Sequence, residues 1–129
     1  MSYLALGIGP GDEVIVPGFG FLCVANIALH VGAKPIFADV DGKSWCVTAE
    51  NIKPLITKKT KAVAVIHTYG NVCDMDSILA LAKTNNLMVI EDAAQSCGSK
   101  YKGKYSGTMG EVGIYSFQAT KTITTGEGG

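Results

Sequence analysis

The sequence predicts an α/β fold in which helices flank a mostly parallel β-sheet. Short β-branched runs alternate with helical patterns along the chain, and the runs are almost continuously apolar. Continuous apolarity is typical of strands that are covered on both faces, as in a parallel sheet. Of the 129 residues, 47% are hydrophobic and 17% are charged, a balance that supports a packed core. Strands that alternate with helices form right-handed βαβ units, so we expect one sheet in one domain.

The expected strands are five short runs, each bounded by Gly, Pro, Asp or Asn. They cover residues 13–17, 34–40, 61–69, 87–92 and 112–117. Ligands of parallel sheets bind outside the carboxyl ends of the strands, so the polar residues there are candidate functional residues. These residues are Asp39, His67, Asp92 and Ser116.

The first expected helix covers residues 21–31 and is apolar almost all round, which predicts a buried helix. Gly32 follows it as a natural C-cap. Thr48 is a typical N-cap for a second helix, and Pro54 should shorten or kink that helix.

A third helix can begin at a cap formed by Asp74 or Asp76, and it should end at Asn85 and Asn86. Residues 98–110 carry polar and aromatic side chains punctuated by Gly. This pattern is typical of an irregular loop or a hairpin.

Charge and apolar patterning exclude several classes of function. The 11 basic and 11 acidic residues cancel, which leaves no strong electrostatic signal for nucleic acid or an anionic membrane. No segment reaches the ~18 apolar residues of a membrane span, and the first residues lack the pattern of a secretory signal peptide. We therefore expect a soluble cytoplasmic protein. The four cysteines lie singly, which favours buried or inert thiols over a zinc site or a disulfide framework.

Two residues in the last third of the chain have the chemistry of a catalytic site. Asp92 follows a buried apolar run, and Lys121 lies just beyond the next expected strand. A lysine in a sheltered cleft can form a Schiff base, and a buried carboxylate can pair with a protonated pyridine nitrogen. Spacing alone favours the other interpretation, in which Lys121 is a solvated surface lysine and Asp92 a helix cap.

Three segments together resemble a known family. They are GIGPGDEVIVPGFGFLCVANIALHVGAKPIFADVD, VIEDAAQSCGSKYKGK and YSFQATKTITTGEGG, and the likeness runs from about Leu6 to Gly129. They are similar to the DegT/DnrJ/EryC1/StrS sugar aminotransferases. The resemblance implies a pyridoxal 5'-phosphate enzyme of the aspartate aminotransferase fold, with this chain as the central part of a fold-type I large domain.

The resemblance also implies roles for individual residues. Lys121 matches the lysine that bonds to the cofactor and later shuttles a proton, and Asp92 matches the partner of the pyridinium nitrogen. Gln95 matches a polar residue beside the ring, Ser116 a hydroxyl on the cofactor phosphate, and Phe21 an aromatic residue stacked on the ring.

Alternatives stay open for several of these residues. Gln95 also fits a polar residue at a helix start, Ser116 a strand-end residue that bonds the backbone, and Phe21 a core residue. The family places hydroxyl residues where this chain has Gly18 and Gly20. His67 fits a structural histidine as well as a functional one.

The implied reaction moves an amino group from glutamate to a nucleotide-linked keto-deoxysugar. Lysine at position 121 is similar to the aminotransferases and unlike the related dehydratases, which carry histidine there. The form KTITTGEGG resembles enzymes that aminate the fourth carbon of a 4-keto-6-deoxyhexose. The family acts as homodimers, so the resemblance implies a homodimeric parent enzyme.

Family members are considerably longer than this chain. We expect residues 1–129 to be a partial cofactor-binding large domain, without the upstream phosphate loop and the small C-terminal domain. Two hypotheses follow. The chain is part of an active sugar aminotransferase, or it is a truncated, catalytically silent α/β module with an interaction or remnant role.

Overall fold

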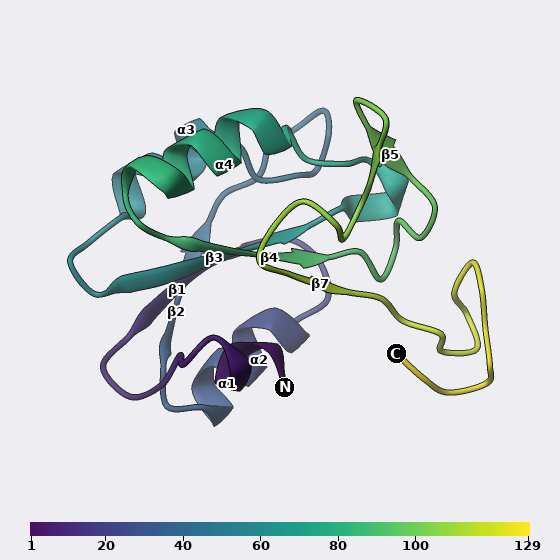
Figure 1. Ribbon diagram of the computed structural model, residues 1–129, viewed down its shortest axis with the longest axis horizontal. Coiled ribbons are helices and arrows are strands. Elements are labelled where there is room, and N and C mark those ends of the chain that lie inside the picture. Colours follow the sequence, from purple (N-terminus) through teal and green to yellow (C-terminus); the bar gives the residue numbers. More distant parts are fainter.

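A five-stranded parallel sheet forms the centre of the molecule. The computed structural model describes residues 1–129. The strands of the sheet are β1 (Glu13–Pro17), β2 (Lys34–Ala38), β3 (Thr60–Ile66), β4 (Met88–Asp92) and β7 (Val112–Ile114). Their spatial order is β2-β1-β3-β4-β7, and every neighbouring pair is parallel (Figure 1). The predicted α/β fold with a mostly parallel sheet is therefore confirmed.

Three strands end earlier than the sequence predicted. β2 ends at Ala38, β3 at Ile66 and β7 at Ile114. The pairing explains these ends. Ile66 and Ile114 both lie beside Asp92, the last residue of β4, and Ala38 lies beside Pro17, the last residue of β1. Beyond these residues no strand pairing continues, and the chain turns into the loops that carry the polar residues.

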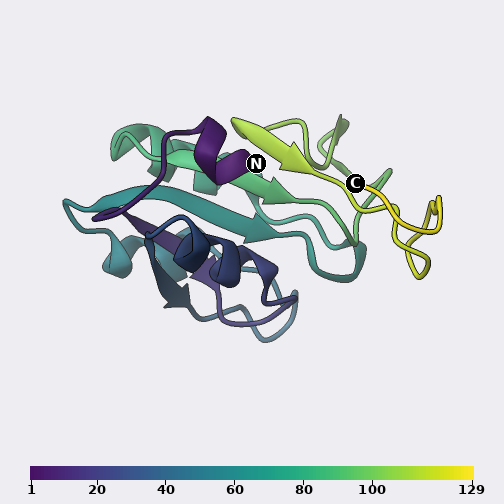
Figure 2. The ribbon, with the colours of Figure 1, turned by 90° about the horizontal axis from the view of Figure 1, so that it is seen from below.

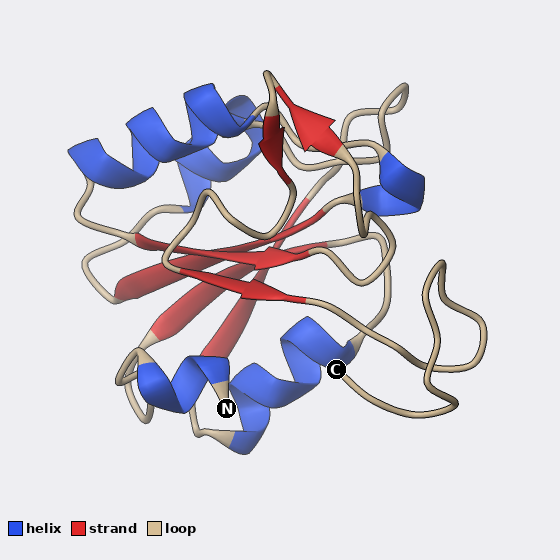
Figure 3. Ribbon diagram, turned by 45° about the vertical axis from the view of Figure 1, so that its right-hand side comes forward, coloured by secondary structure: helices blue, strands red, loops and turns tan.

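The helices cover both faces of the sheet. α1 (Ser2–Ala5) and α2 (Cys23–His30) lie on one face, and α3 (Ala49–Ile52) and α4 (Met75–Thr84) lie on the other (Figure 3). Side chains that alternate along β3 enter separate cores on the two faces, with Ala64 on the side of α2 and Val65 on the side of α4. This double coverage explains the continuous apolar runs in the sequence.

The prediction that the first helix is buried was wrong. α2 begins at Cys23, and only one of its faces packs on the sheet, through Val24, Ala25 and Ala28. On the other face Leu29 is 61% exposed. An all-round apolar pattern therefore did not mean all-round burial within this chain.

The predicted helix ends are confirmed. Gly32 adopts a φ of +81° after α2, and its N–H donates to the carbonyl of Leu29. The next N–H, of Ala33, donates to the carbonyl of Ala28, which completes a Schellman motif. Thr48 caps α3 in a capping box with Asn51.

Proline and asparagine act as the sequence indicated. Pro54 lies in the 3-10 turn Lys53–Leu55, which ends the short α3. Asp74 occupies the N-cap position of α4, but its side chain makes no capping hydrogen bond and accepts the Ser77 hydroxyl instead. Asn86 follows this helix with a φ of 54°. The expected hairpin is present as the antiparallel pair β5 (Lys100–Tyr101) and β6 (Lys104–Tyr105).

The last segment of the chain, residues 115–129, leaves the sheet without regular secondary structure. Figure 2 shows it extending beyond the carboxyl ends of the strands. None of the helices has the length and apolarity needed to cross a membrane.

Candidate active site

A cavity of about 610 Å³ lies at the carboxyl ends of β4 and β7. Its wall contains all five residues that the sequence analysis selected for the cofactor site, together with five others. The selected residues are Phe21, Asp92, Gln95, Ser116 and Lys121. They come from three separate segments of the chain, so the fold brings together side chains that are up to 100 positions apart (121 − 21).

Asp92 presents a carboxylate to this cavity from the end of β4. It is only 5% exposed, and its Oδ1 accepts the N–H of Ala94 at 2.9 Å. The only hydrogen-bond partner of Oδ2 within the chain is the Cys23 thiol, at 4.0 Å. A carboxylate oxygen accepts two or more hydrogen bonds, so Oδ2 can accept a stronger donor from the cavity.

Cys23, which was not among the predicted site residues, lies in the cavity wall beside Asp92. Burial raises the pKa of its thiol, and the nearby Asp92 carboxylate raises it further. The thiol therefore stays protonated near neutral pH and donates to Asp92. The signal in the sequence was weak, because a single cysteine at a helix start resembles an ordinary apolar residue.

Phe21 is 72% exposed, so its interpretation as a core residue is wrong. The glycine before it has a φ of +130°, and a Cβ on Gly20 would lie 2.6 Å from Cδ1 of Ile66. A close approach of the backbone to β3 therefore explains one of the two glycines that replace the hydroxyl residues of the family. The resulting turn places the Phe21 ring in the cavity wall.

Gln95 is fixed by the loop that follows β3. Its Oε1 accepts the backbone N–H of Tyr69 at 3.0 Å, while its amide nitrogen has no partner within the chain. The side chain is half-buried in the cavity wall. The amide N–H groups are consequently available to a ligand.

Ser116 and Lys121 reach the cavity from residues 115–129. The N–H of Gln118 donates to Ser116 Oγ at 3.4 Å, and the N–H of Lys121 donates to the Gln118 carbonyl at 2.9 Å. This turn brings the hydroxyl and the amine to the same cavity. Lys121 is half-buried, whereas most lysines of the chain are exposed, and it makes no salt bridge.

The other two polar residues at strand ends do not line the cavity. Asp39 is exposed, and its carboxylate accepts the N–H of Val40. His67 is completely buried behind the site. Its Nδ1 accepts the N–H of Cys73 at 3.3 Å, so the ring proton is on Nε2, which donates to Glu91 at 2.9 Å. These bonds favour the structural interpretation of His67.

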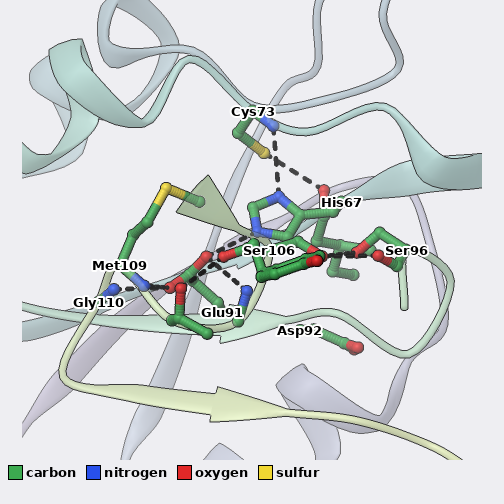
Figure 4. Close-up of polar contacts among 12 residues, drawn as sticks. His67, Cys73, Glu91, Asp92, Ser96, Ser106, Met109 and Gly110 are labelled. Atoms are coloured by element: carbon green, nitrogen blue, oxygen red, sulfur yellow. Dashed lines mark hydrogen bonds and ion pairs between the residues drawn. The ribbon is translucent and has the colours of Figure 1, made fainter. Parts of the chain in front are cut away.

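Glu91 is the centre of a buried hydrogen-bond network (Figure 4). Its Oε2 accepts from His67 Nε2 and from the N–H of Gly107, each at 2.9 Å. Its Oε1 accepts the N–H groups of Met109 and Gly110, each at 2.6 Å. The carboxylate thus joins the end of β3 to the loop that leads into β7.

The network lowers the pKa of the Glu91 carboxyl. Burial alone raises that pKa, but the His67 side chain and the three backbone N–H groups lower it by more. Figure 4 shows Asp92 on the other side of β4, away from this network. Successive residues of one strand therefore serve the two faces of the sheet, one as an internal anchor and one in the cavity wall.

Comparisons with known proteins agree with the geometry. The sequence profile of the DegT/DnrJ/EryC1/StrS aminotransferase family matches residues 1–129. The chain is 52% identical to GDP-perosamine synthase of Escherichia coli O157:H7 over 129 residues, which are 100% of this chain and 35% of that protein. It is 46% identical to UDP-N-acetyl-3-dehydro-alpha-D-glucosamine 3-aminotransferase of Acidithiobacillus ferrooxidans, over 100% of this chain and 35% of that protein.

A solved structure gives the same result. The aminotransferase from Psychrobacter cryohalolentis superposes with a TM-score of 0.96 at 44% identity, over 98% of this chain and 32% of the other. The chain therefore spans about a third of the length of the relatives that it matches.

Proposed function

Because the chain belongs to the DegT/DnrJ/EryC1/StrS aminotransferase family, we propose that it is the central part of the cofactor-binding domain of a sugar aminotransferase that uses pyridoxal phosphate. The observation that carries this proposal is the single cavity lined by Lys121, Asp92, Ser116, Gln95 and Phe21. An amine, a carboxylate, a hydroxyl, an amide and an aromatic ring are the groups that this cofactor needs around it.

The residues of the cavity fit the cofactor. The free accepting position on Asp92 Oδ2 suits a cationic ring N–H, and the exposed face of Phe21 suits a flat ring. Ser116 offers a short hydroxyl donor for the phosphate, and the amide nitrogen of Gln95 offers a donor for the ring substituents. When bound, pyridoxal phosphate withdraws electrons from the reacting carbon and carries the amino group between donor and acceptor.

Lys121 has the central part in moving protons. Its Nζ lies in the cavity wall without a carboxylate partner, so it is free to hold the cofactor and then to take and return a proton at the substrate carbon. Asp92 is the partner of the ring nitrogen, through its Oδ2. Its accepted bond from Ala94 keeps the carboxylate in one orientation.

The substrate that we propose is a nucleotide-linked keto-deoxysugar, with glutamate as the amino donor. The names of two relatives contain a GDP-linked and a UDP-linked sugar, which supports a nucleotide sugar in general. The segment KTITTGEGG supports amination of the fourth carbon of a 4-keto-6-deoxyhexose. We further propose that the complete enzyme is a cytoplasmic homodimer, with this chain as part of each large domain.

Trapping of the cofactor tests the proposal. The protein that carries this chain is incubated with pyridoxal phosphate, reduced with borohydride and digested, and the labelled peptide is identified by mass spectrometry. We expect the label on Lys121 and its loss in Lys121→Ala, because no other lysine lines the cavity. The control is Lys83→Ala, which removes an exposed lysine from the last turn of α4.

Labelling at another lysine, or equal labelling of Lys121→Ala, would contradict the assignment. Absence of any label would favour the alternative, a catalytically silent α/β module. Transamination of a nucleotide-linked keto sugar, measured as glutamate consumption, tests the substrate in the same preparation.

A further inference from the structure

Three aromatic side chains form an exposed cluster beside the cavity. Phe19 follows β1, Trp45 lies in the loop after β2, and Tyr69 lies in the loop after β3. The ring centroids of Phe19 and Trp45 are 4.9 Å apart, and those of Phe19 and Tyr69 are 6.3 Å apart. Trp45 is 46% exposed and Tyr69 is 73% exposed. We call these three residues the aromatic shelf.

The backbone holds two of these rings at the surface in an unfavourable conformation. Trp45 has a φ of 60° and Tyr69 a φ of 54°, in the left-handed region that bulky residues rarely adopt. Hydrogen bonds fix both positions, from the Trp45 N–H to the Asp41 carbonyl and from the Tyr69 N–H to Gln95 Oε1. Strain of this kind persists where the surrounding structure over-determines it, and it is concentrated at functional sites.

The loops beneath the shelf are bonded to one another. The N–H of Gly18 donates to the Ala38 carbonyl at 2.7 Å, which joins the loops after β1 and β2. The side-chain amide of Asn71 donates to the Ser44 carbonyl at 3.3 Å, which joins the loops after β2 and β3. The shelf is therefore a preformed surface that a ligand can use without first ordering it.

Two hollows connect the shelf with the cofactor cavity. One of about 400 Å³ is lined by Phe19, Phe21, Tyr69 and Gln95 among others, and one of about 380 Å³ by Tyr69, Gln95 and Lys121 among others. Phe21, Gln95 and Lys121 also line the cavity itself. Because the hollows share lining residues with one another and with the cavity, a trough leads from Lys121, past Gln95, to Phe19 and Tyr69 of the shelf.

We propose that the aromatic shelf binds the nucleobase of the sugar nucleotide, an inference that rests on the function proposed above. The reacting sugar has to lie beside Lys121, and its diphosphate then carries the base along the trough. The three shelf residues bear no charge, so they suit the flat, uncharged base better than the phosphates. Stacking depends little on which base is present, because every base has an aromatic face. The shelf therefore fits guanine as well as uracil.

Ligand binding to the cofactor-loaded protein tests this inference. Isothermal titration measures the affinity for GDP and for glucose 1-phosphate, which has no base. The variants are Trp45→Asn and Tyr69→Asn, because Asn tolerates a left-handed backbone and so removes the ring without adding strain. Tyr69→Phe keeps the stacking face. The control is Phe37→Ala, an aromatic residue on β2 that is 54% exposed and lies outside the shelf.

We expect each Asn variant to weaken GDP binding by about 5- to 150-fold, the usual range for the loss of one stacked base. Binding of glucose 1-phosphate should stay unchanged, and Tyr69→Phe and Phe37→Ala should bind GDP like the unmodified protein. Unchanged GDP affinity in both Asn variants overturns the inference, and so does equal weakening of both ligands. Dissociation of the oligomer in size-exclusion chromatography, with GDP affinity intact, would identify the shelf as a subunit contact instead.

Failure of this inference differs from failure of the proposed function. If Lys121 is labelled by the cofactor but the unmodified protein does not bind GDP or UDP, the shelf does not hold a base and the aminotransferase proposal stands. If Lys121 is not labelled, the aminotransferase proposal itself fails, whatever the affinity for GDP.

Discussion

Replacement of Glu91 by Gln tests the buried network most directly. Each carboxylate oxygen of Glu91 accepts two hydrogen bonds, from His67 and Gly107 on one side and from Met109 and Gly110 on the other. Gln has one accepting oxygen, and its other terminal atom is a nitrogen that only donates. The His67 donor is buried and the three backbone donors are partly buried. Two of these four donors therefore lose their acceptor in either orientation of the amide.

The magnitude follows from this count. A buried donor without an acceptor costs about 1–3 kcal/mol, so two of them cost about 2–6 kcal/mol. Whole domains are stable by only about 5–15 kcal/mol, so the loss is large and measurable. Glu127→Gln is the matched control, because the Glu127 side chain is exposed and makes no hydrogen bond.

The assay is urea unfolding followed by circular dichroism, at neutral pH, for both variants and the unmodified protein. We expect a loss of at least about 2 kcal/mol in the free energy of unfolding for Glu91→Gln, and less than about 0.5 kcal/mol for the exposed control. A loss below about 1 kcal/mol in Glu91→Gln would refute the reasoning, since the two donors left without Glu91 would then have found other acceptors.

Three further predictions follow from the same geometry. The lowered pKa of Glu91 means that its carboxylate stabilises the fold above the usual value of 4.5 and loses that contribution as pH falls through the folded-state pKa. When the free energy of unfolding is measured against pH, the values for Glu91→Gln and the unmodified protein should therefore converge below pH 4.5. A difference that stays constant with pH would contradict this. Gly113→Ala should lower the melting temperature, because the new Cβ would lie 1.8 Å from the Gly107 carbonyl oxygen, whereas Gly42→Ala has nothing within 4 Å and should be neutral. Asp92→Asn should release pyridoxal phosphate about 10- to 150-fold faster in dialysis, since one charge-assisted bond of about 1.5–3 kcal/mol is lost, and unchanged retention would remove Asp92 from the site.

Local sequence patterns predicted well those features of the fold that depend on a single segment of the chain. Continuous apolar runs identified all five strands of the sheet, and Gly32 and Thr48 identified helix ends. Each of these features depends only on residues that are close to it in the sequence. The carboxyl ends of the strands were less accurate. They depend on where the adjacent strand ends. The end of β7 at Ile114, for example, coincides with the end of its neighbour β4.

The candidate site was found through a resemblance to a family and not through spacing. Asp92 and Lys121 alone were also consistent with a helix cap and a surface lysine, and only the fold brings them to one cavity. Glu91 was missed because its partners, His67 and the loop before β7, are distant in sequence. An acidic residue inside an apolar strand was the available signal, since a buried carboxylate requires several donors.

The exposed side of α2 was not predictable from periodicity. The pattern shows how apolar a helix is, and it contains no information on which surfaces are available to cover it. Leu22 and Leu29 are 58% and 61% exposed in this chain. Under the proposal that the chain is the central part of a longer enzyme, additional sequence or a second subunit would cover them.

The placement of two adjacent carboxyl groups on β4 restricts how that strand can align during folding. A shift by one residue would move Glu91 into the cavity and turn Asp92 towards His67. The longer side chain would then occupy the space of the ligand, and the shorter one would fall one methylene short of the donors. Either error leaves polar groups without hydrogen-bond partners, so a misaligned β4 is disfavoured on both faces of the sheet. A single-residue insertion between Met88 and Glu91 would consequently remove the internal anchor and the ligand partner together.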